Sequence, residues 1–116
     1  MAPRITTDSW QLVCRLDELE VERGATALVH GQAIALFRMV GDDVYALGNH
    51  DPYAKASGMA RGIVGRRGGV PFVGSPAHRH VFDLRTGRCL EDSHVGVPAY
   101  AVQIVEGLVY VGGRLS

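Results

Sequence analysis

The stretch "GATALVHGQAIALFRMVGDDVYALGN" at residues 24–49 decides the fold class. It contains three short apolar runs, which are broken at "HGQ" and at "GDD". The valine, isoleucine, phenylalanine and tyrosine in these runs favour β-strands. Glycine at each break supplies the positive backbone angles that a tight hairpin turn needs. The stretch therefore predicts three short strands joined by two hairpins.

The same pattern continues on both sides of this stretch. Before it, "WQLVCR" is typical of an edge or half-buried strand, and "LDELE" is long enough for about one helical turn. After residue 70, further short strands are expected at "PFVGS", "HVFDL", "RCLE", "AYAVQIV" and "LVYVGG", with hairpin tips at "RTG" and "EG". No segment has the length and 3.6-residue period of a major helix. We therefore expect an all-β sandwich or barrel of about nine or ten short strands, with two loops projecting from one end.

Length and composition indicate one folded domain. The chain has 116 residues, of which 47% are hydrophobic and 21% charged, values typical of a globular domain. Residues 1–9 lack apolar periodicity and are predicted to be a flexible tail, with the domain over 10–116. The apolar runs are far shorter than the ~20 residues that cross a bilayer, and the first ten residues do not look like a signal peptide. We expect a cytoplasmic chain without a membrane partner.

Charge is balanced overall but unevenly distributed. Twelve basic and twelve acidic residues give a net charge of zero, which argues against a nucleic-acid-binding module defined by overall charge. Basic residues gather between 52 and 90, where Asp83 is the only acidic residue, whereas acidic residues outnumber basic ones between 14 and 51. Such polarity can steer an encounter with an oppositely charged partner, although exposed charge runs are usually solvated surface.

The segment from 51 to 70 is rich in glycine and arginine and shows no periodicity. It carries no GxGxxG or Walker-type phosphate motif, and no long helix follows it, so nucleotide binding is not predicted. A long irregular connection in a small domain is usually functional or mobile. We expect it to be a docking surface for a partner protein, with a solvated loop as the alternative. The predicted partner-binding residues are Tyr53, Lys55, Met59, Arg61, Arg66, Arg67 and Arg79.

Two stretches, "ALGNHDPYAKA" at 46–56 and "SPAHRHVFDLRTG" at 75–87, resemble the cluster-binding region of Rieske iron–sulfur domains. That family has a Cys-Pro-His loop and a later Cys-Pro-x-His loop, which leads into a strand and a hairpin. Two thiolates hold one iron of the [2Fe-2S] cluster and two imidazoles hold the other. The resemblance implies a Rieske-like fold.

The ligand positions of that family are largely changed in this chain. When the prolines are aligned, Asp51 and Ser75 stand in place of the two cysteines, and Tyr53 stands in place of the first histidine. Only His78 keeps its ligand type. Hard oxygen donors are poor substitutes for the thiolates of an iron–sulfur cluster. We therefore expect no [2Fe-2S] cluster and no other cofactor in this chain.

A hydrogen-bonded pin is the expected replacement for the cluster. An Asp-Pro step commonly starts a turn whose carboxylate caps nearby backbone amides. We hypothesise that Asp51, Tyr53, Ser75 and His78 hydrogen-bond to one another and hold the two loops together.

The histidines and cysteines offer weaker alternatives. His78 and His80 are two residues apart at the expected start of a strand and would share a face, with His50 or His94 as a third nitrogen. Such pairs are more often surface residues, so no metal site is predicted.

The two cysteines, Cys14 and Cys89, belong to no CxxC or CxH pattern. Each is expected to be a small buried hydrophobic residue. The sequence also contains no GxSxG or HExxH motif, so the chain is not expected to be catalytic alone.

Nearly the whole of residues 10–112 resembles one family with this same loss of ligands. "WQLVCRLDEL", "NHDPY", the 56–92 stretch and the closing "VPAYAVQIVEGLVYV" are similar to the small subunit (NirD) of the bacterial assimilatory NAD(P)H-dependent nitrite reductase. The resemblance implies a non-redox accessory subunit of a cytoplasmic enzyme that reduces nitrite to ammonia. It also implies a large catalytic subunit as partner, carrying FAD, an iron–sulfur cluster and siroheme. A Rieske-type ferredoxin of an oxygenase and a free-standing binding or regulatory module remain as alternatives.

Overall fold

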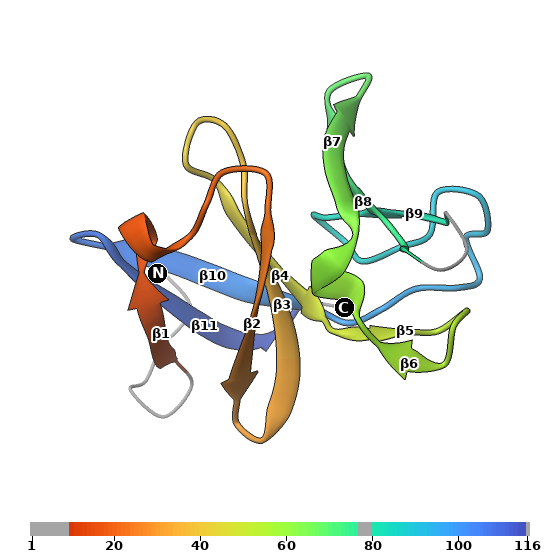
Figure 1. Cartoon of the computed structure of the whole chain (residues 1–116). Coiled ribbons are helices and arrows are strands. Elements are labelled where there is room, and N and C mark those ends of the chain that lie inside the picture. Colours follow the sequence, from red (N-terminus) through yellow and green to blue (C-terminus); the bar gives the residue numbers. More distant parts are fainter. Residues whose placement is uncertain (1–9, 77–79, 116) are drawn as a thin grey trace.

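The computed structural model describes residues 10–76 and 80–115, and these form almost only β-structure (Figure 1). Two short 3-10 turns, η1 (Leu16–Glu18) and η2 (Met59–Arg61), accompany the strands. The strands are β1 (Gln11–Arg15), β2 (Gly24–Val29), β3 (Gln32–Arg38), β4 (Val44–Gly48), β5 (His50–Asp51), β6 (Ala56–Ser57), β7 (Ile63–Arg67), β8 (Val70–Gly74), β9 (Val81–Asp83), β10 (Ala99–Val105) and β11 (Leu108–Arg114). Over these residues no helix has the length and apolar character needed to cross a membrane.

The stretch at 24–49 forms the predicted hairpins. Strands β2, β3 and β4 pair antiparallel, and Val29 lies opposite Gln32 across a two-residue turn. Both turn residues, His30 and Gly31, have positive φ angles of 49° and 77°, as this kind of hairpin requires. The predicted three strands are confirmed.

These strands belong to a six-stranded antiparallel sheet in the order β1-β11-β10-β4-β3-β2. The sheet curls until its two edge strands approach each other. The Gln11 side-chain amide bridges this gap, because its Nε2 donates to the Leu28 carbonyl at 3.1 Å and its Oε1 accepts from the His30 amide at 3.0 Å. The side chain thereby takes the place of a peptide group in a nearly closed barrel.

The remaining strands form a smaller part beside the barrel. Strands β7, β8 and β9 make a three-stranded sheet, and β5 pairs with β6. The β7–β8 hairpin projects away from the barrel (Figure 1). Its two tip residues, Gly68 and Gly69, have φ angles of 57° and 85°, which favour glycine.

Two expectations about this smaller part were wrong, an irregular segment over 51–70 and a strand at "RCLE". Residues 51–70 contain β6 and β7, and the described chain has eleven strands in all, close to the nine or ten expected. Gly65 interrupts the apolar pattern of β7, and a Cβ there would lie 2.9 Å from the Phe72 ring, so the Phe72 side chain on the opposite strand occupies the space next to the glycine. The segment "RCLE" forms only isolated bridges, because Cys89 and Arg88 pair with two different partners.

Strand β3 separates two hydrophobic cores. Ile34 and Leu36 point into the barrel, whereas Ala35 and Phe37 point toward the smaller part, and all four are at most 1% exposed. A strand buried on both faces reads as a continuous apolar run, which explains "AIALF". Close packing joins the two parts at Gly24, where a Cβ would lie 2.0 Å from the Ala60 carbonyl oxygen.

Candidate functional site

A buried carboxylate joins the two loops that resemble a cluster site. Asp51 and Ser75 are 2% and 3% exposed, and the Ser75 hydroxyl donates a hydrogen bond to Asp51 Oδ2. The other carboxylate oxygen, Oδ1, accepts from the backbone amides of Tyr53 at 2.9 Å and Ala54 at 3.3 Å. Charge-assisted hydrogen bonds to a buried carboxylate are among the stronger ones in proteins. We call Asp51 and Ser75 the loop pin.

A second connection runs through Tyr53. Its ring stacks on His80, with centroids 3.5 Å apart and planes 6° from parallel. Its hydroxyl donates to the Cys89 sulfur at 3.5 Å, and the Cys89 thiol donates to Glu91 Oε1 at 3.4 Å. The same carboxylate oxygen accepts from the Val81 amide at 2.9 Å. The first loop is therefore also tied to the segment that follows β9.

These contacts shift the ionisation of two groups. The hydrogen bond to Cys89, with burial as a second cause, raises the pKa of Tyr53 to about 12. The pKa of Glu91 lies below its ordinary value, chiefly because the carboxylate accepts from the Val81 backbone amide. Both shifts preserve the hydrogen-bonded forms, a neutral phenol and a charged carboxylate, over the physiological pH range.

The Tyr53 contact predicts a loss of stability at high pH. An unfolded tyrosine ionises near its ordinary pKa of about 10, below the folded value of about 12. The unfolded state therefore binds fewer protons between these values, and the Tyr53 contribution to stability falls as pH rises through this window. We expect urea unfolding at pH 8 to 12 to show this slope, and expect Tyr53→Phe to lose it. An identical slope in Tyr53→Phe would contradict the assignment.

The hypothesis of a polar pin is supported only for part of its residues. Asp51 and Ser75 bond directly, but Tyr53 reaches Asp51 through its backbone amide and directs its side chain elsewhere. His78 lies outside the described residues. Cys89 and Glu91 were not among the predicted site residues, although their i, i+2 spacing after a hairpin was a usable signal that both face one side.

The donor groups at these positions do not fit a [2Fe-2S] cluster. The Asp51 carboxylate is occupied by a hydroxyl and two amides, and the Tyr53 hydroxyl is directed at a sulfur. Within residues 10–76 and 80–115 no group of three or more His, Cys, Asp or Glu side chains is placed to hold a metal ion. His80 precedes β9 and stacks on Tyr53, so it does not begin a strand as expected.

The cysteines differ in their surroundings. Cys89 is 2% exposed, as predicted, whereas Cys14 is only partly buried. Partial burial, with Glu18 as a second cause, raises the pKa of the Cys14 thiol, so it resists forming the reactive thiolate.

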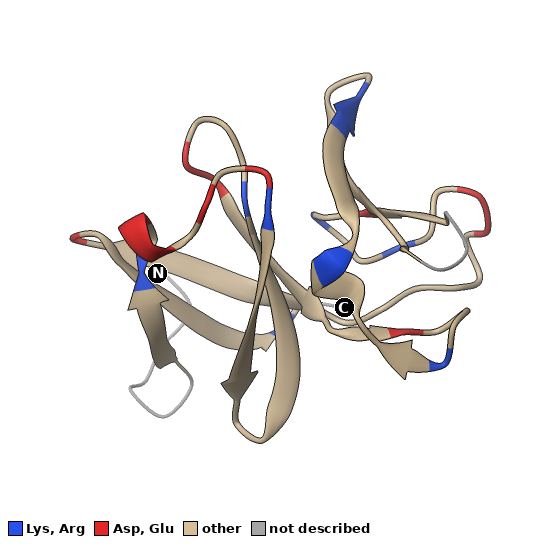
Figure 2. Cartoon of the chain, viewed as in Figure 1, with Lys and Arg blue, Asp and Glu red and all other residues tan. Residues whose placement is uncertain are grey.

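Four of the predicted partner-binding residues are exposed cations of the smaller part. Arg66 and Arg67 end strand β7, Arg61 ends η2, and Lys55 lies between β5 and β6. Figure 2 shows the arginines of β7 near the tip of the projecting hairpin. They lie well apart from the acidic residues of η1 and of the turns before β2 and β4, which we call the acidic end of the barrel. Among the ion pairs of the described residues, none involves these four cations. We call them the basic face.

Two other predicted partner-binding residues, Met59 and Tyr53, are not exposed. Met59 is fully buried, because η2 directs it into the core beside Phe82, so it cannot meet a partner. Tyr53 is half-buried and is engaged by His80 and Cys89. Ile63 on β7, which was not among the predicted partner-binding residues, is 78% exposed. Arg79 lies outside the described residues.

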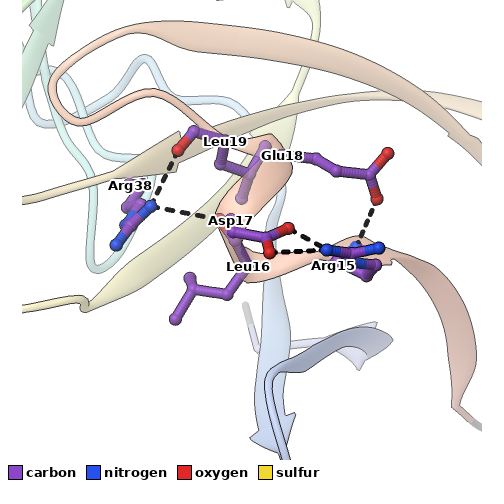
Figure 3. A network of polar contacts seen from close by, with 6 residues as sticks. All are labelled: Arg15, Leu16, Asp17, Glu18, Leu19 and Arg38. Carbon is purple, nitrogen blue, oxygen red and sulfur yellow. Dashed lines mark hydrogen bonds and ion pairs between the residues drawn. The ribbon is translucent and has the colours of Figure 1, made fainter.

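The acidic end of the barrel is internally neutralised to a greater extent. Arg38 Nη1 donates to the carbonyls of Leu16 and Leu19 at 3.2 and 2.9 Å, which fastens η1 to β3 (Figure 3). Its Nη2 also forms an ion pair with Asp42 at 2.7 Å, and Arg15 pairs with Asp17 at 2.7 Å. These arginines neutralise part of the negative charge at the acidic end of the barrel. The cations of the basic face form no ion pair with the described residues, so their charge remains available to a partner protein.

Comparison with known proteins relates this geometry to a family. Residues 9–112 match the family described as "Rieske-like [2Fe-2S] domain". The chain is 34% identical to the nitrite reductase (NADH) small subunit of Salmonella typhimurium, over 90% of this chain and 97% of that one. The solution structure of the nitrite reductase NAD(P)H small subunit from Erwinia carotovora superposes with a TM-score of 0.77 at 42% identity, covering 92% of this chain and 83% of that one.

A third relative contains a similar domain as part of a longer protein. The chain is 38% identical to part of the nitrite reductase NAD(P)H large subunit of Klebsiella oxytoca, over 97% of this chain. The match spans only 12% of that protein's length. The same kind of domain therefore occurs both as a separate chain and as a segment of a large subunit.

Proposed function

The chain belongs to the nitrite reductase small-subunit family, whose members are Rieske-like domains. On this basis we propose that it is a non-redox accessory subunit of a nitrite reductase. The observation that carries the proposal is the loop pin. Asp51 and Ser75 occupy the two positions where a Rieske domain has thiolates, and they bond to each other. The two loops are thus shaped without iron, and the chain acts on its partner by contact.

The proposed partner is the large catalytic subunit. Support comes from the Klebsiella oxytoca large subunit, which contains a similar domain within its own chain. A domain that is fused in one organism and separate in another works next to the same neighbouring domains if its role is unchanged. We propose that this partner carries the FAD, iron–sulfur cluster and siroheme that reduce nitrite to ammonia, and that the complex is cytoplasmic.

The basic face is the proposed contact with the large subunit. Its four cations, Lys55, Arg61, Arg66 and Arg67, lie on the part of the chain that carries the loop pin. Ile63, on the same strand as Arg66 and Arg67, provides an exposed apolar side chain. The guanidinium of Arg67 lies over the Phe72 ring at 5.4 Å, which limits its motion and lowers the entropy lost on binding. A complementary partner surface would carry carboxylates around an apolar patch.

Charge reversal tests this contact. We expect Arg66→Glu combined with Arg67→Glu to weaken binding to the large subunit by at least about tenfold at low salt, because it exchanges attraction for repulsion. The salt dependence of the dissociation constant should also decrease. Isothermal titration or biolayer interferometry at two or more salt concentrations measures both quantities.

A matched control reverses two charges at the acidic end of the barrel. Arg15→Glu with Arg23→Glu makes the same change in net charge, and both arginines are exposed there. We expect this control to bind the large subunit nearly as well as the unchanged chain. Equal effects of the two double variants would show that net charge, rather than the basic face, governs binding.

A further inference from the structure

A second feature of the chain is a cleft that involves neither the loop pin nor the basic face. The cleft, of about 270 Å³, opens between the turn that follows β9, the segment that precedes β10, and the end of β11. Thr86, Gly87, Arg88, Ser93, His94, Val95, Gly96, Val97, Pro98 and Arg114 line it.

Basic side chains from three separate segments line the cleft. Arg88, His94 and Arg114 all contribute to its walls, and all three residues are exposed. None of the described residues that line it has a carboxylate. A concave surface lined by charge of one sign concentrates the electrostatic field and attracts counter-ions of the opposite sign. The cleft therefore favours an anion.

The backbone holds Arg88 in place at this cleft. The Arg88 amide donates to Thr86 Oγ1 at 3.1 Å, and its Nη1 donates to the Ser93 carbonyl at 3.4 Å. The guanidinium thus spans from the turn to the segment before β10 and keeps other N–H groups for a ligand. An arginine that is already positioned loses less conformational entropy when it binds an oxyanion.

Two glycines allow the floor of the cleft to form. Gly87 has a φ of 78°, and a Cβ there would lie 2.0 Å from the Val97 carbonyl oxygen. A Cβ at Gly96 would lie 3.0 Å from the Gly87 carbonyl oxygen. The Val97 amide donates to the Gly87 carbonyl at 2.8 Å. The two backbone segments therefore cross in close contact. Because both residues are glycines, no Cβ or larger side chain at these positions fills the space above the crossing.

We propose that this cleft binds a small oxyanion of the phosphate type. Its volume is slightly below the roughly 300–1,000 Å³ of pockets for drug-sized ligands, so it fits a small anion better than a dinucleotide. The planar fork of a guanidinium matches two oxygens of a phosphate, and two arginines border the cleft. The site would bind either free phosphate or the phosphate group of a small metabolite.

An NMR titration of the full chain tests the proposal. Inorganic phosphate is added at constant ionic strength while the amide signals of Gly87 and Gly96 are followed. We expect saturable shifts at these amides and small shifts at Gly68 and Gly69, which lie at the tip of the β7–β8 hairpin. A parallel titration with glycerol phosphate distinguishes the sources, because tighter binding than inorganic phosphate would assign the site to a phosphorylated metabolite.

Variants assign the effect to the cleft. We expect Arg88→Gln with Arg114→Gln to weaken phosphate binding by about tenfold or more, since two charge-assisted contacts are lost. Arg88→Lys, which keeps the charge but not the fork, should weaken it to a lesser extent. Arg66→Gln with Arg67→Gln removes the same charge from the basic face and should leave the affinity unchanged.

Three results would overturn the proposal. One is a shift that grows linearly with phosphate and never saturates. Another is equal affinity for acetate, nitrite or chloride, which would show general counter-ion binding. The last is an unchanged affinity in the Arg88→Gln, Arg114→Gln variant, provided that its amide spectrum shows the native fold. None of these results bears on whether the chain is a nitrite reductase subunit.

Discussion

Replacing Asp51 with alanine is expected to lower the free energy of unfolding by about 3 kcal/mol, which corresponds to roughly 12–15 °C in Tm for a domain of this size. The Asp51 carboxylate accepts from the Ser75 hydroxyl and from the amides of Tyr53 and Ala54. Its removal leaves three donors without this acceptor in a region where Asp51 is 2% exposed. Buried donors that lose their acceptor account for large effects of single substitutions.

Two further variants separate the causes of this effect. Asp51→Asn keeps an acceptor oxygen and nearly the same shape but loses the charge. We therefore expect its free energy of unfolding to lie between that of Asp51→Ala and that of the unchanged chain. Asp43→Ala removes an exposed carboxylate and should change stability by no more than about 0.5 kcal/mol. Thermal unfolding followed by circular dichroism measures all three. A Tm for Asp51→Ala equal to that of Asp43→Ala would show that the carboxylate does not hold the loops.

Strand positions could be predicted well where the chain is locally consistent. Residues 24–49 alternate strand-forming runs with turn residues, and the hairpins form where those breaks occur. The double burial of β3 was also visible as the unbroken apolar run "AIALF". In these segments, residue preference, turn chemistry and burial all favour the same structure.

The smaller part was predicted less well, because its strands depend on contacts between distant residues. Gly65 weakens the apolar pattern of β7, and the Phe72 ring on β8 packs over it. Met59 was expected at the surface because it lies in a glycine-rich segment, but η2 directs it into the core. A single sequence contains no signal for such long-range packing.

The candidate site was predictable by position but not by contact. Alignment of the prolines identified Asp51 and Ser75, which indeed bond to each other. The partners of Tyr53 could not be foreseen, because Cys89 is 36 residues away in the chain and reaches Tyr53 only through the strand order β7-β8-β9. The loop pin and the Tyr53 contacts together show how two loops of a Rieske-like domain can keep a defined shape without thiolate ligands.

The proposed contact role predicts how the chain would affect the large subunit. A subunit that acts by positioning its partner changes the rate without carrying electrons, and a small misplacement of reacting groups can reduce a rate by about a hundredfold. The same chain would then be needed in a stoichiometric amount, because it remains bound during turnover. A ferredoxin, in contrast, would act as a mobile carrier and would need its own redox centre.

Nitrite-dependent oxidation of NADH or NADPH by the matching large subunit, with and without the purified chain, tests the central claim most directly. Iron content and visible absorbance of the chain are measured on the same sample. We expect the rate to fall by at least about tenfold without the chain, and to recover fully when one equivalent of iron-free chain is added. A rate that does not depend on the chain, or that recovers only with a chain carrying a [2Fe-2S] cluster, would contradict the account.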